Sequence, residues 1–244
     1  MKLILLPLAL FGLLTDLSCG QSTGRESTAS QTADSLYQYR DASRDGIGKQ
    51  YQGREIAQVM GHLGADWLDR PEREQEERTD LLLDALALKP TDVVADIGAG
   101  TGYFTFRMAP AVPQGRVLAV DIQPEMIEYL NENRKKQKAS NVQPVLGTIT
   151  DPKLPPNSID MALMVDAYHE FSHPYEMMRQ IVKALRPGGR VVLVEYRAED
   201  PSVPIKPLHK MSVRQATREM KAVGLMFEKV ARTLPQQHII FFKK

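Results

Sequence analysis

The 244-residue chain has very little cysteine: its only one is Cys19. A single thiol cannot build an intramolecular disulfide framework or a zinc ribbon. Because Cys19 lies within the first twenty residues, cysteine chemistry is excluded from the rest of the chain. We expect no metal site.

An excess of either charge is also missing. Lys and Arg number 31 and Asp and Glu 30, which gives a net charge of +1. Nucleic-acid binding usually depends on a surplus of positive charge that displaces counterions. The basic run 134–138 is best explained as the solvated end of a helix, where cations are favoured. We therefore predict no nucleic-acid partner.

The longest apolar run near the N-terminus, residues 3–14, is too short to span a membrane. As a helix it would be about 18 Å long, against roughly 30 Å of hydrocarbon. After Lys2 it has the proportions of a secretory signal. A buried N-terminal helix is the alternative. We predict a signal peptide over residues 1–19 and, from its Ser, Thr, Gln and Gly content, a flexible tether over 20–36.

The pair Cys19-Gly20 resembles the end of a bacterial lipoprotein signal, in which the cysteine is acylated. That pattern places Leu three residues earlier, where this chain has Asp16, with Leu17 one place late. We expect export, either to the periplasm or as a membrane tether lipidated at Cys19. A retained anchor facing the cytoplasm is the alternative.

From Pro71 onward, helix and strand patterns alternate. The expected helices cover 72–88, 102–108, 124–138 and 174–189, and the expected strands cover 93–97, 115–121, 141–147, 158–166 and 190–197. Nearly continuous apolar strands between helices are typical of a parallel sheet covered on both faces. Segments 225–233 and 238–242 alternate as an antiparallel hairpin does. The fold class is therefore α/β, doubly wound.

Three glycines follow the first of these strands. Gly98, Gly100 and Gly102 give G-x-G-x-G, whereas a dinucleotide fingerprint needs its third glycine where Tyr103 stands. Asp96, just before the turn, suits a ligand with a positive amine better than a pyrophosphate. A plain tight turn between strand and helix remains the alternative.

The second strand ends in an acid, Asp121, roughly twenty residues past the glycines. An acid in this place can accept hydrogen bonds from both hydroxyls of an adenosine ribose. Taken alone, it fits NAD as well as any other adenosine ligand. A loop acid without a ligand is the other interpretation.

Together with 159–166 and "RPGG" at 186–189, these motifs resemble those of the class I S-adenosylmethionine-dependent methyltransferases, from about Arg70 to the C-terminus. The resemblance implies a Rossmann-like, seven-stranded sheet, mostly parallel, with an antiparallel C-terminal hairpin strand. It also implies S-adenosylmethionine as cofactor, across the carboxyl ends of the first, second and fourth strands. The residues it assigns to the cofactor are Asp96, Gly98, Ala99, Gly100, Gly102, Tyr103, Asp121, Ile122, Met126, Thr148, Ile149 and Asp166. The acid that the family often has after the third strand is missing, and Asp151 or a backbone group would replace it.

The sequence after the fourth strand, "DAYHEFSHP", supplies the candidate catalytic residues. His169 could act as a base on an oxygen, nitrogen or carbon acceptor, assisted by Glu170 and Tyr168. The same residues could merely cap a helix. Tyr103, Phe104 and Tyr168 could also hold the sulfonium cation on their ring faces or simply pack. Glu195 and Tyr196 end the fifth strand at the same edge.

The segment 37–70 precedes the methyltransferase-like part, which we place at 71–244. N-terminal extensions in this superfamily often cover the acceptor site, and this one carries the only tryptophan, Trp67, with His62 nearby. We expect it to form a lid; a helix packed on the edge of the sheet is the alternative.

The absence of two sequence features narrows the choice of methyl acceptor. Arsenite methyltransferases work through several cysteines, and amino-DNA methyltransferases carry Asn/Asp-Pro-Pro-Tyr where this chain has "DAYH". A small or lipid-like acceptor remains, or a protein side chain.

The alternatives to a methyltransferase are a non-catalytic binding protein and, least favoured, an NAD-dependent oxidoreductase. S-adenosylmethionine is made in the cytoplasm, so an exported enzyme would need a supply of it.

Overall fold

The computed structural model describes residues 36–244 together with positions 1 and 3. The predicted signal peptide, the lipidation at Cys19 and nearly all of the predicted tether lie outside these residues. No helix within the described part of the chain is both long enough and apolar enough to cross a membrane.

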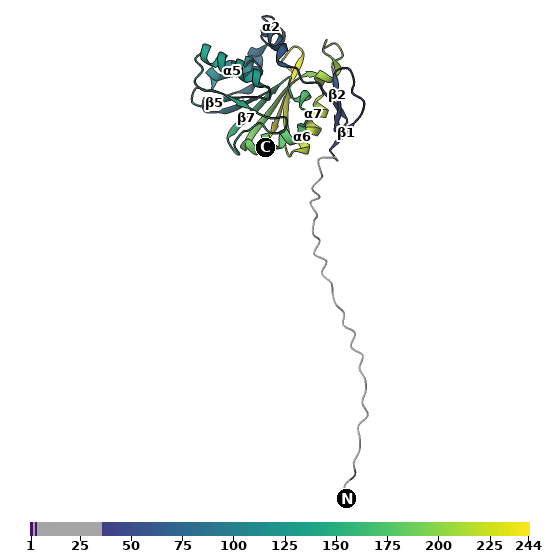
Figure 1. The fold of residues 1–244 in the computed structure, drawn as a ribbon. Helices are drawn as coiled ribbons and strands as arrows, with labels where there is room; N and C mark the ends of the chain where they lie inside the picture. Colours follow the sequence, from purple (N-terminus) through teal and green to yellow (C-terminus); the bar gives the residue numbers. More distant parts are fainter. Residues whose placement is uncertain (2, 4–35) are drawn as a thin grey trace. The chain divides into compact units, whose positions relative to one another are not determined.

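A large sheet forms the centre of the fold (Figure 1). Its strands are β4 (Val93–Ile97), β5 (Arg116–Asp121), β6 (Val142–Leu146), β7 (Ile159–Val165), β8 (Leu185–Arg197), β10 (Met226–Ala231) and β11 (Gln237–Lys243). They follow the order β10-β11-β8-β7-β4-β5-β6, and a two-residue strand, β9 (Lys210–Met211), pairs with β8 off this path. Strands β4 to β8 are parallel, and β11 runs antiparallel between β8 and β10. The predicted fold class is confirmed.

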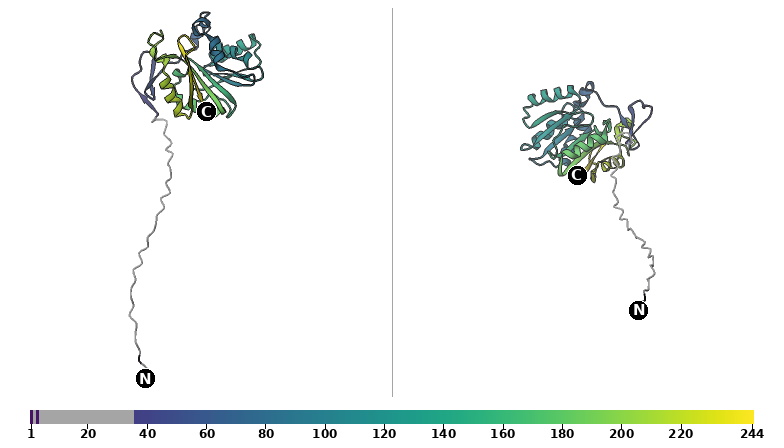
Figure 2. Two further views of the ribbon diagram at one scale, coloured as in Figure 1. Left: turned by 180° about the vertical axis from the view of Figure 1, so that it is seen from behind. Right: turned by 60° about the horizontal axis from the view of Figure 1, so that its bottom comes forward.

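Helices cover both faces of this sheet (Figure 2). One face carries α3 (Thr79–Leu86), α4 (Tyr103–Met108) and α5 (Pro124–Lys136), and the other carries α6 (Pro174–Ala184) and α7 (Val213–Ala222). Along β4, Ala95 and Ile97 pack in the cluster that contains α6 and α7, whereas Val94 packs in the cluster of the opposite face. This period of two with apolar residues on both faces is what the continuous apolar strands predicted.

The N-terminal extension folds as a second, three-stranded antiparallel sheet, which the sequence analysis did not predict. Its strands are β1 (Tyr37–Tyr39), β2 (Gly46–Tyr51) and β3 (Arg54–Ala57), followed by η2 (His62–Gly64) and α1 (Ala65–Leu68). Gln52 and Gly53 both have positive φ, 51° and 86°. A two-residue loop of this conformation is the type I′ turn that matches the twist of a hairpin. The extension is therefore mainly strand, and its helical part is limited to residues 62–68.

Two predicted helices differ from those observed. The helix expected over 72–88 is divided into α2 (Arg73–Glu77) and α3 by Arg78, which has a φ of 51°. The helix expected to run to Gly189 ends at Ala184, because Leu185 is extended and pairs with Ile159. Helix α7 was not predicted at all.

Candidate functional site

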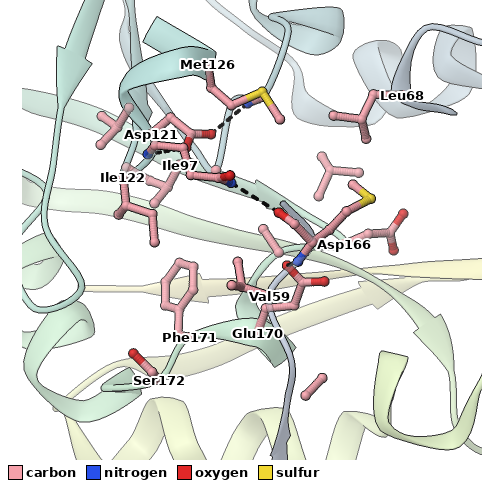
Figure 3. Close-up of a pocket in the computed structure, with 18 of the residues that line it drawn as sticks. Val59, Leu68, Ile97, Asp121, Ile122, Met126, Asp166, Glu170, Phe171 and Ser172 are labelled. Carbon is pink, nitrogen blue, oxygen red and sulfur yellow. Dashed lines mark hydrogen bonds between the residues drawn. The ribbon is translucent and has the colours of Figure 1, made fainter. Parts of the chain in front are cut away.

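A pocket opens at the carboxyl ends of β4, β5 and β7, where the chain crosses from one side of β4 to the other (Figure 3). Such switch points are where open α/β sheets bind ligands. Most of the lining side chains are apolar. The sequence-predicted residues on the wall are Gly98, Gly100, Asp121, Ile122, Met126, Ile149, Asp166 and Glu170.

The glycine turn brings the backbone close to this pocket. Gly98 and Gly100 have φ values of 77° and 56°, which side-chain-bearing residues rarely adopt. A Cβ at Gly98 would come within 2.8 Å of the Ala167 Cβ, and one at Gly100 within 2.8 Å of the Leu68 Cδ1. Glycine is therefore needed here for both conformation and space.

The Asp121 side chain, at the end of the neighbouring strand β5, is hydrogen-bonded to the glycine turn. Its Oδ2 accepts a hydrogen bond from the Gly100 N–H at 2.9 Å, and its Oδ1 accepts one from the Gln123 N–H at 3.0 Å. Burial raises the pKa of this carboxyl. Each oxygen of a carboxylate can accept two hydrogen bonds, so both retain capacity for a ligand with two hydroxyls.

Asp166 lies at the end of β7 and has a φ of 48°. Its Oδ2 accepts a hydrogen bond from the Gln237 side chain at 2.6 Å, while its buried Oδ1 has no partner among residues 36–244. Burial, together with the negative charges of Glu77 and Glu195, raises its pKa well above the usual value. A buried acceptor of this kind favours a ligand that brings a donor or a positive charge.

Figure 3 divides the wall into two groups of side chains. Asp121, Ile122 and Met126 lie together, and we call them the Asp121 side; Val59, Glu170, Phe171 and Ser172 form the Glu170 side. The Glu170 Oε2 accepts a hydrogen bond from the Met60 N–H at 3.1 Å, and burial raises the pKa of its carboxyl. Glu170 is thus the one predicted catalytic residue that lies on the pocket wall of the described chain.

The other two catalytic candidates lie behind that wall. Tyr168 is fully buried, and its hydroxyl donates to Glu219 at 2.7 Å. His169 is 2% exposed; its Nδ1 is 2.6 Å from the Glu195 Oε2 and its Nε2 is 3.1 Å from the His209 Nδ1. Neither residue touches the pocket directly in this arrangement.

Some predicted cofactor residues also lie off the wall. They are Asp96, Ala99, Gly102, Tyr103 and Thr148. The Asp96 carboxylate accepts a hydrogen bond from the Thr105 hydroxyl at 2.6 Å, while the Tyr103 hydroxyl is hydrogen-bonded to Thr79 and Glu74. Phe104 packs in the core, so none of the three aromatic rings expected near the sulfonium lines the pocket.

The N-terminal extension supplies wall residues that sequence reasoning missed: Ile47, Ala57, Val59, Met60 and Leu68. Trp67, which the lid hypothesis did name, lines the pocket too, whereas His62 lies off the wall with its Nδ1 3.8 Å from the Glu125 carboxylate. In the sequence only Ala57 and Val59 follow an alternating pattern, and two positions are too few to predict that this segment lines a pocket.

Asp96 makes the stability of the protein depend on pH. Desolvation by burial raises its pKa from 3.8 to about 6. Between those two values the folded chain keeps a proton that the unfolded chain releases, so the free energy of unfolding falls as the pH rises. In Asp96→Asn the side-chain oxygen can still accept the hydrogen bond from Thr105, but the titrating carboxyl is gone. The free energy of unfolding of this variant, relative to that of the wild type, should therefore rise by roughly 2–3 kcal/mol between pH 4 and pH 7. Urea unfolding across that range measures the difference.

The matched control for this prediction is Asp84→Asn on the exposed side of α3. Its unfolding free energy should follow the pH curve of the wild-type chain. A constant offset between Asp96→Asn and the wild type at every pH would contradict the assignment.

Comparison with known proteins identifies this architecture. The fold matches the crystal structure of an S-adenosylmethionine-dependent methyltransferase from Aquifex aeolicus, with a TM-score of 0.71 and 22% identity, covering 76% of this chain and 99% of the other. It is thus the fold of the class I S-adenosylmethionine-dependent methyltransferases.

Sequence matches then identify the family. Residues 88–236 match the profile of the methyltransferase domain. An uncharacterized methyltransferase-like protein of Schizosaccharomyces pombe is 32% identical over 126 residues, which are 52% of this chain and 46% of that protein. An arsenite methyltransferase of Halobacterium salinarum is 33% identical over 108 residues, 44% of this chain and 28% of the other. The chain belongs to the methyltransferase domain family. These matches span less than half the length of each of the two curated relatives.

Proposed function

We propose that this protein transfers a methyl group from S-adenosylmethionine to a small or lipid-like acceptor bound in the same pocket. The observation that carries the proposal is the two-part wall: on one part the Asp121 carboxylate lies beside the glycine turn, with Ile122 and Met126, and on the other Val59 and Phe171 lie beside Glu170 and Ser172. A bisubstrate reaction needs one pocket that holds both molecules with the reacting atoms adjacent.

The residues on the Asp121 side fit the cofactor. The Asp121 carboxylate would accept hydrogen bonds from the ribose hydroxyls, and Ile122, Met126 and Ile149 would pack on the adenine. The unpaired Asp166 Oδ1 suits a cationic or donor group of the same ligand. When bound, S-adenosylmethionine supplies a methyl group activated by its sulfonium charge.

The Glu170 side supports an apolar acceptor. Val59 and Phe171 are joined on the wall by Ile47, Ala57 and Trp67 from the N-terminal extension. Such a surface binds hydrocarbon or an aromatic ring and excludes water from the reacting atoms. Glu170 is the charged group among them, and its proposed role is to orient the nucleophilic atom of the acceptor. Because the chain has no cysteine besides Cys19, we do not extend the arsenite chemistry of the Halobacterium relative to it.

Calorimetric titration of the full chain tests the cofactor half of this proposal. S-adenosylmethionine and its demethylated product should bind with one-to-one stoichiometry, and NAD should not bind. Transfer of labelled methyl to a panel of hydroxylated aromatic and lipid acceptors then tests catalysis. Cofactor binding without transfer to any acceptor would instead support a non-catalytic binding protein.

A bulky side chain on the Glu170 side should weaken the binding of the acceptor without weakening the binding of the cofactor. Val59 is 48% exposed, so Val59→Trp can fill the pocket without overpacking the core. We expect the KM for an apolar acceptor to rise by about tenfold or more, while the cofactor Kd stays nearly constant.

Leu63→Trp is the matched control for this substitution. Leu63 is 90% exposed and lies off the pocket wall, so both constants should stay at their wild-type values. An unchanged acceptor KM in Val59→Trp would place the acceptor elsewhere.

A further inference from the structure

We propose that His169, Glu170 and His209 form a binding site for one divalent transition-metal ion. The three potential ligand atoms are the His169 Nε2, the Glu170 Oε1 and the His209 Nδ1. The two nitrogens are 3.1 Å apart, and the carboxylate oxygen is 3.8 Å from the His169 nitrogen and 3.6 Å from the His209 nitrogen.

These separations match the size of a transition-metal ion. The circle through the three atoms has a radius of about 2.0 Å, close to the zinc–nitrogen and zinc–oxygen distances of roughly 2.0–2.2 Å. One ion at or slightly above the plane of the three atoms would therefore reach all of them without movement of the backbone. Further positions around the ion would be left for water or a ligand.

A hydrogen-bonded network without metal leaves part of this cluster unexplained. The two imidazole nitrogens can share one proton at 3.1 Å, but the Glu170 Oε1 is too far from both for a hydrogen bond. An ion would engage all three atoms at once.

Glu195 supplies the second argument. Its Oε2 lies 2.6 Å from the His169 Nδ1, which fixes the ring with its other nitrogen directed at the cluster. A carboxylate on the far nitrogen of a histidine is the usual second partner in zinc sites, where it sets the tautomer and increases ligand basicity. Glu195 is fully buried, and its Oε1 has no hydrogen-bond partner within residues 36–244.

The local charge also favours a dication. Glu170 and Glu195 bring two carboxylates to the cluster. Arg54, which donates to the His169 backbone oxygen, has its own charge paired with Glu219. A divalent ion would compensate both carboxylates, as buried charges require.

The donor set indicates the class of ion. Two imidazoles and one carboxylate suit Zn²⁺, Co²⁺ or Fe²⁺, whereas Mg²⁺ and Ca²⁺ prefer oxygen ligands throughout. Because Glu170 also lines the pocket, the ion would lie beside the acceptor. The metal site itself does not depend on the proposed methyl transfer.

Metal titration of the full-length chain, first stripped with a chelator, tests this site. We expect Zn²⁺ to bind at one ion per chain, Co²⁺ to give a ligand-field absorption band, and Mg²⁺ to leave both signals unchanged. His209→Ala removes one ligand from a partly exposed position and should abolish the stoichiometric site. Glu195→Gln should weaken Zn²⁺ binding by about 10- to 100-fold.

His62→Ala is the matched control, because among residues 36–244 the only carboxylate within 4 Å of its imidazole is that of Glu125. It should keep the wild-type affinity, and the single cysteine is present in every variant. Thermal unfolding of each apo-protein verifies folding, and cofactor titration of the same samples keeps a failure of the proposed function separate. A folded wild-type chain that binds no Zn²⁺, or a His209→Ala variant with wild-type affinity, would overturn the proposal.

Discussion

Replacing Asp121 with alanine is expected to weaken the binding of S-adenosylmethionine and of its demethylated product by about a hundredfold or more. The substitution removes the carboxylate that would accept two hydrogen bonds from the ribose hydroxyls. Each hydrogen bond to a charged group contributes roughly 1.5–3 kcal/mol. It also leaves the Gly100 and Gln123 N–H groups without their carboxylate partner, which loosens the glycine turn. Calorimetric titration of the variant measures the loss.

Asp121→Asn separates these two contributions. The amide oxygen can still accept one backbone hydrogen bond, but the charge is lost, so its affinity should lie between those of the wild type and the alanine variant. Glu125→Gln, an exposed acid in the first turn of α5, is the matched control and should bind normally. Full affinity in Asp121→Ala would rule out this carboxylate as the ribose anchor.

Replacing Arg54 with leucine is expected to lower the free energy of unfolding by about 3–5 kcal/mol, because it leaves a buried carboxylate without its cation. The Arg54 guanidinium makes two hydrogen bonds to Glu219, at 2.9 and 3.0 Å, and the Glu219 side chain is fully buried. This pair joins β3 of the N-terminal extension to α7. Urea unfolding followed by circular dichroism measures the loss.

Two further variants define the origin of that loss. The double variant Arg54→Leu/Glu219→Leu removes both charges and should recover much of the stability. Lys206→Leu breaks an exposed ion pair with Asp45, which also connects the extension to the rest of the domain, and should lower the free energy of unfolding far less than Arg54→Leu does. Equal losses in Arg54→Leu and Lys206→Leu would show that burial of the pair is irrelevant.

The large sheet could be predicted because its strands are almost continuously apolar, and the helices between them are bounded by proline and glycine. Helix α7 has a weaker pattern: among its ten residues, Val213, Ala216 and Met220 form a narrow apolar stripe, and Glu219 is buried beside them. The cap at Ser212, whose hydroxyl oxygen accepts from the Gln215 N–H, was its clearest signal.

The break between α2 and α3 had no such signal. Arg78 adopts a left-handed conformation without glycine or proline nearby. Ala87, at the end of α3, is left-handed too, but it lies three residues before Pro90. Tertiary packing of Leu82 and Leu86 against the sheet decides these conformations, and local propensity does not reveal them.

The site could be predicted where backbone spacing determines position. Gly98, Gly100 and Asp121 are fixed by the turn and the strand ends, and the motif spacing thus predicts their position at the edge of the sheet where the pocket lies. Side-chain direction was harder: Gly102 faces Phe106 inside the helix layer, and Asp96 points to α4. Glu195 was expected at the same edge of the sheet, but its direct contact with His169 was not, and His209 comes from a distant segment that only the folded chain brings to His169.

The buried Arg54–Glu219 pair has a consequence for how molecules enter and leave the pocket. A hinge motion of the hairpin β2–β3 would separate Arg54 from Glu219 and leave the buried carboxylate without its cation, so we expect this hairpin to stay in place. The stretch 58–68 contains no buried charge and exposes Leu63 and Trp67 to solvent. If the protein has the proposed function, we therefore expect its ligands to enter and leave the pocket beside residues 58–68, by local opening of that stretch rather than by displacement of the whole extension.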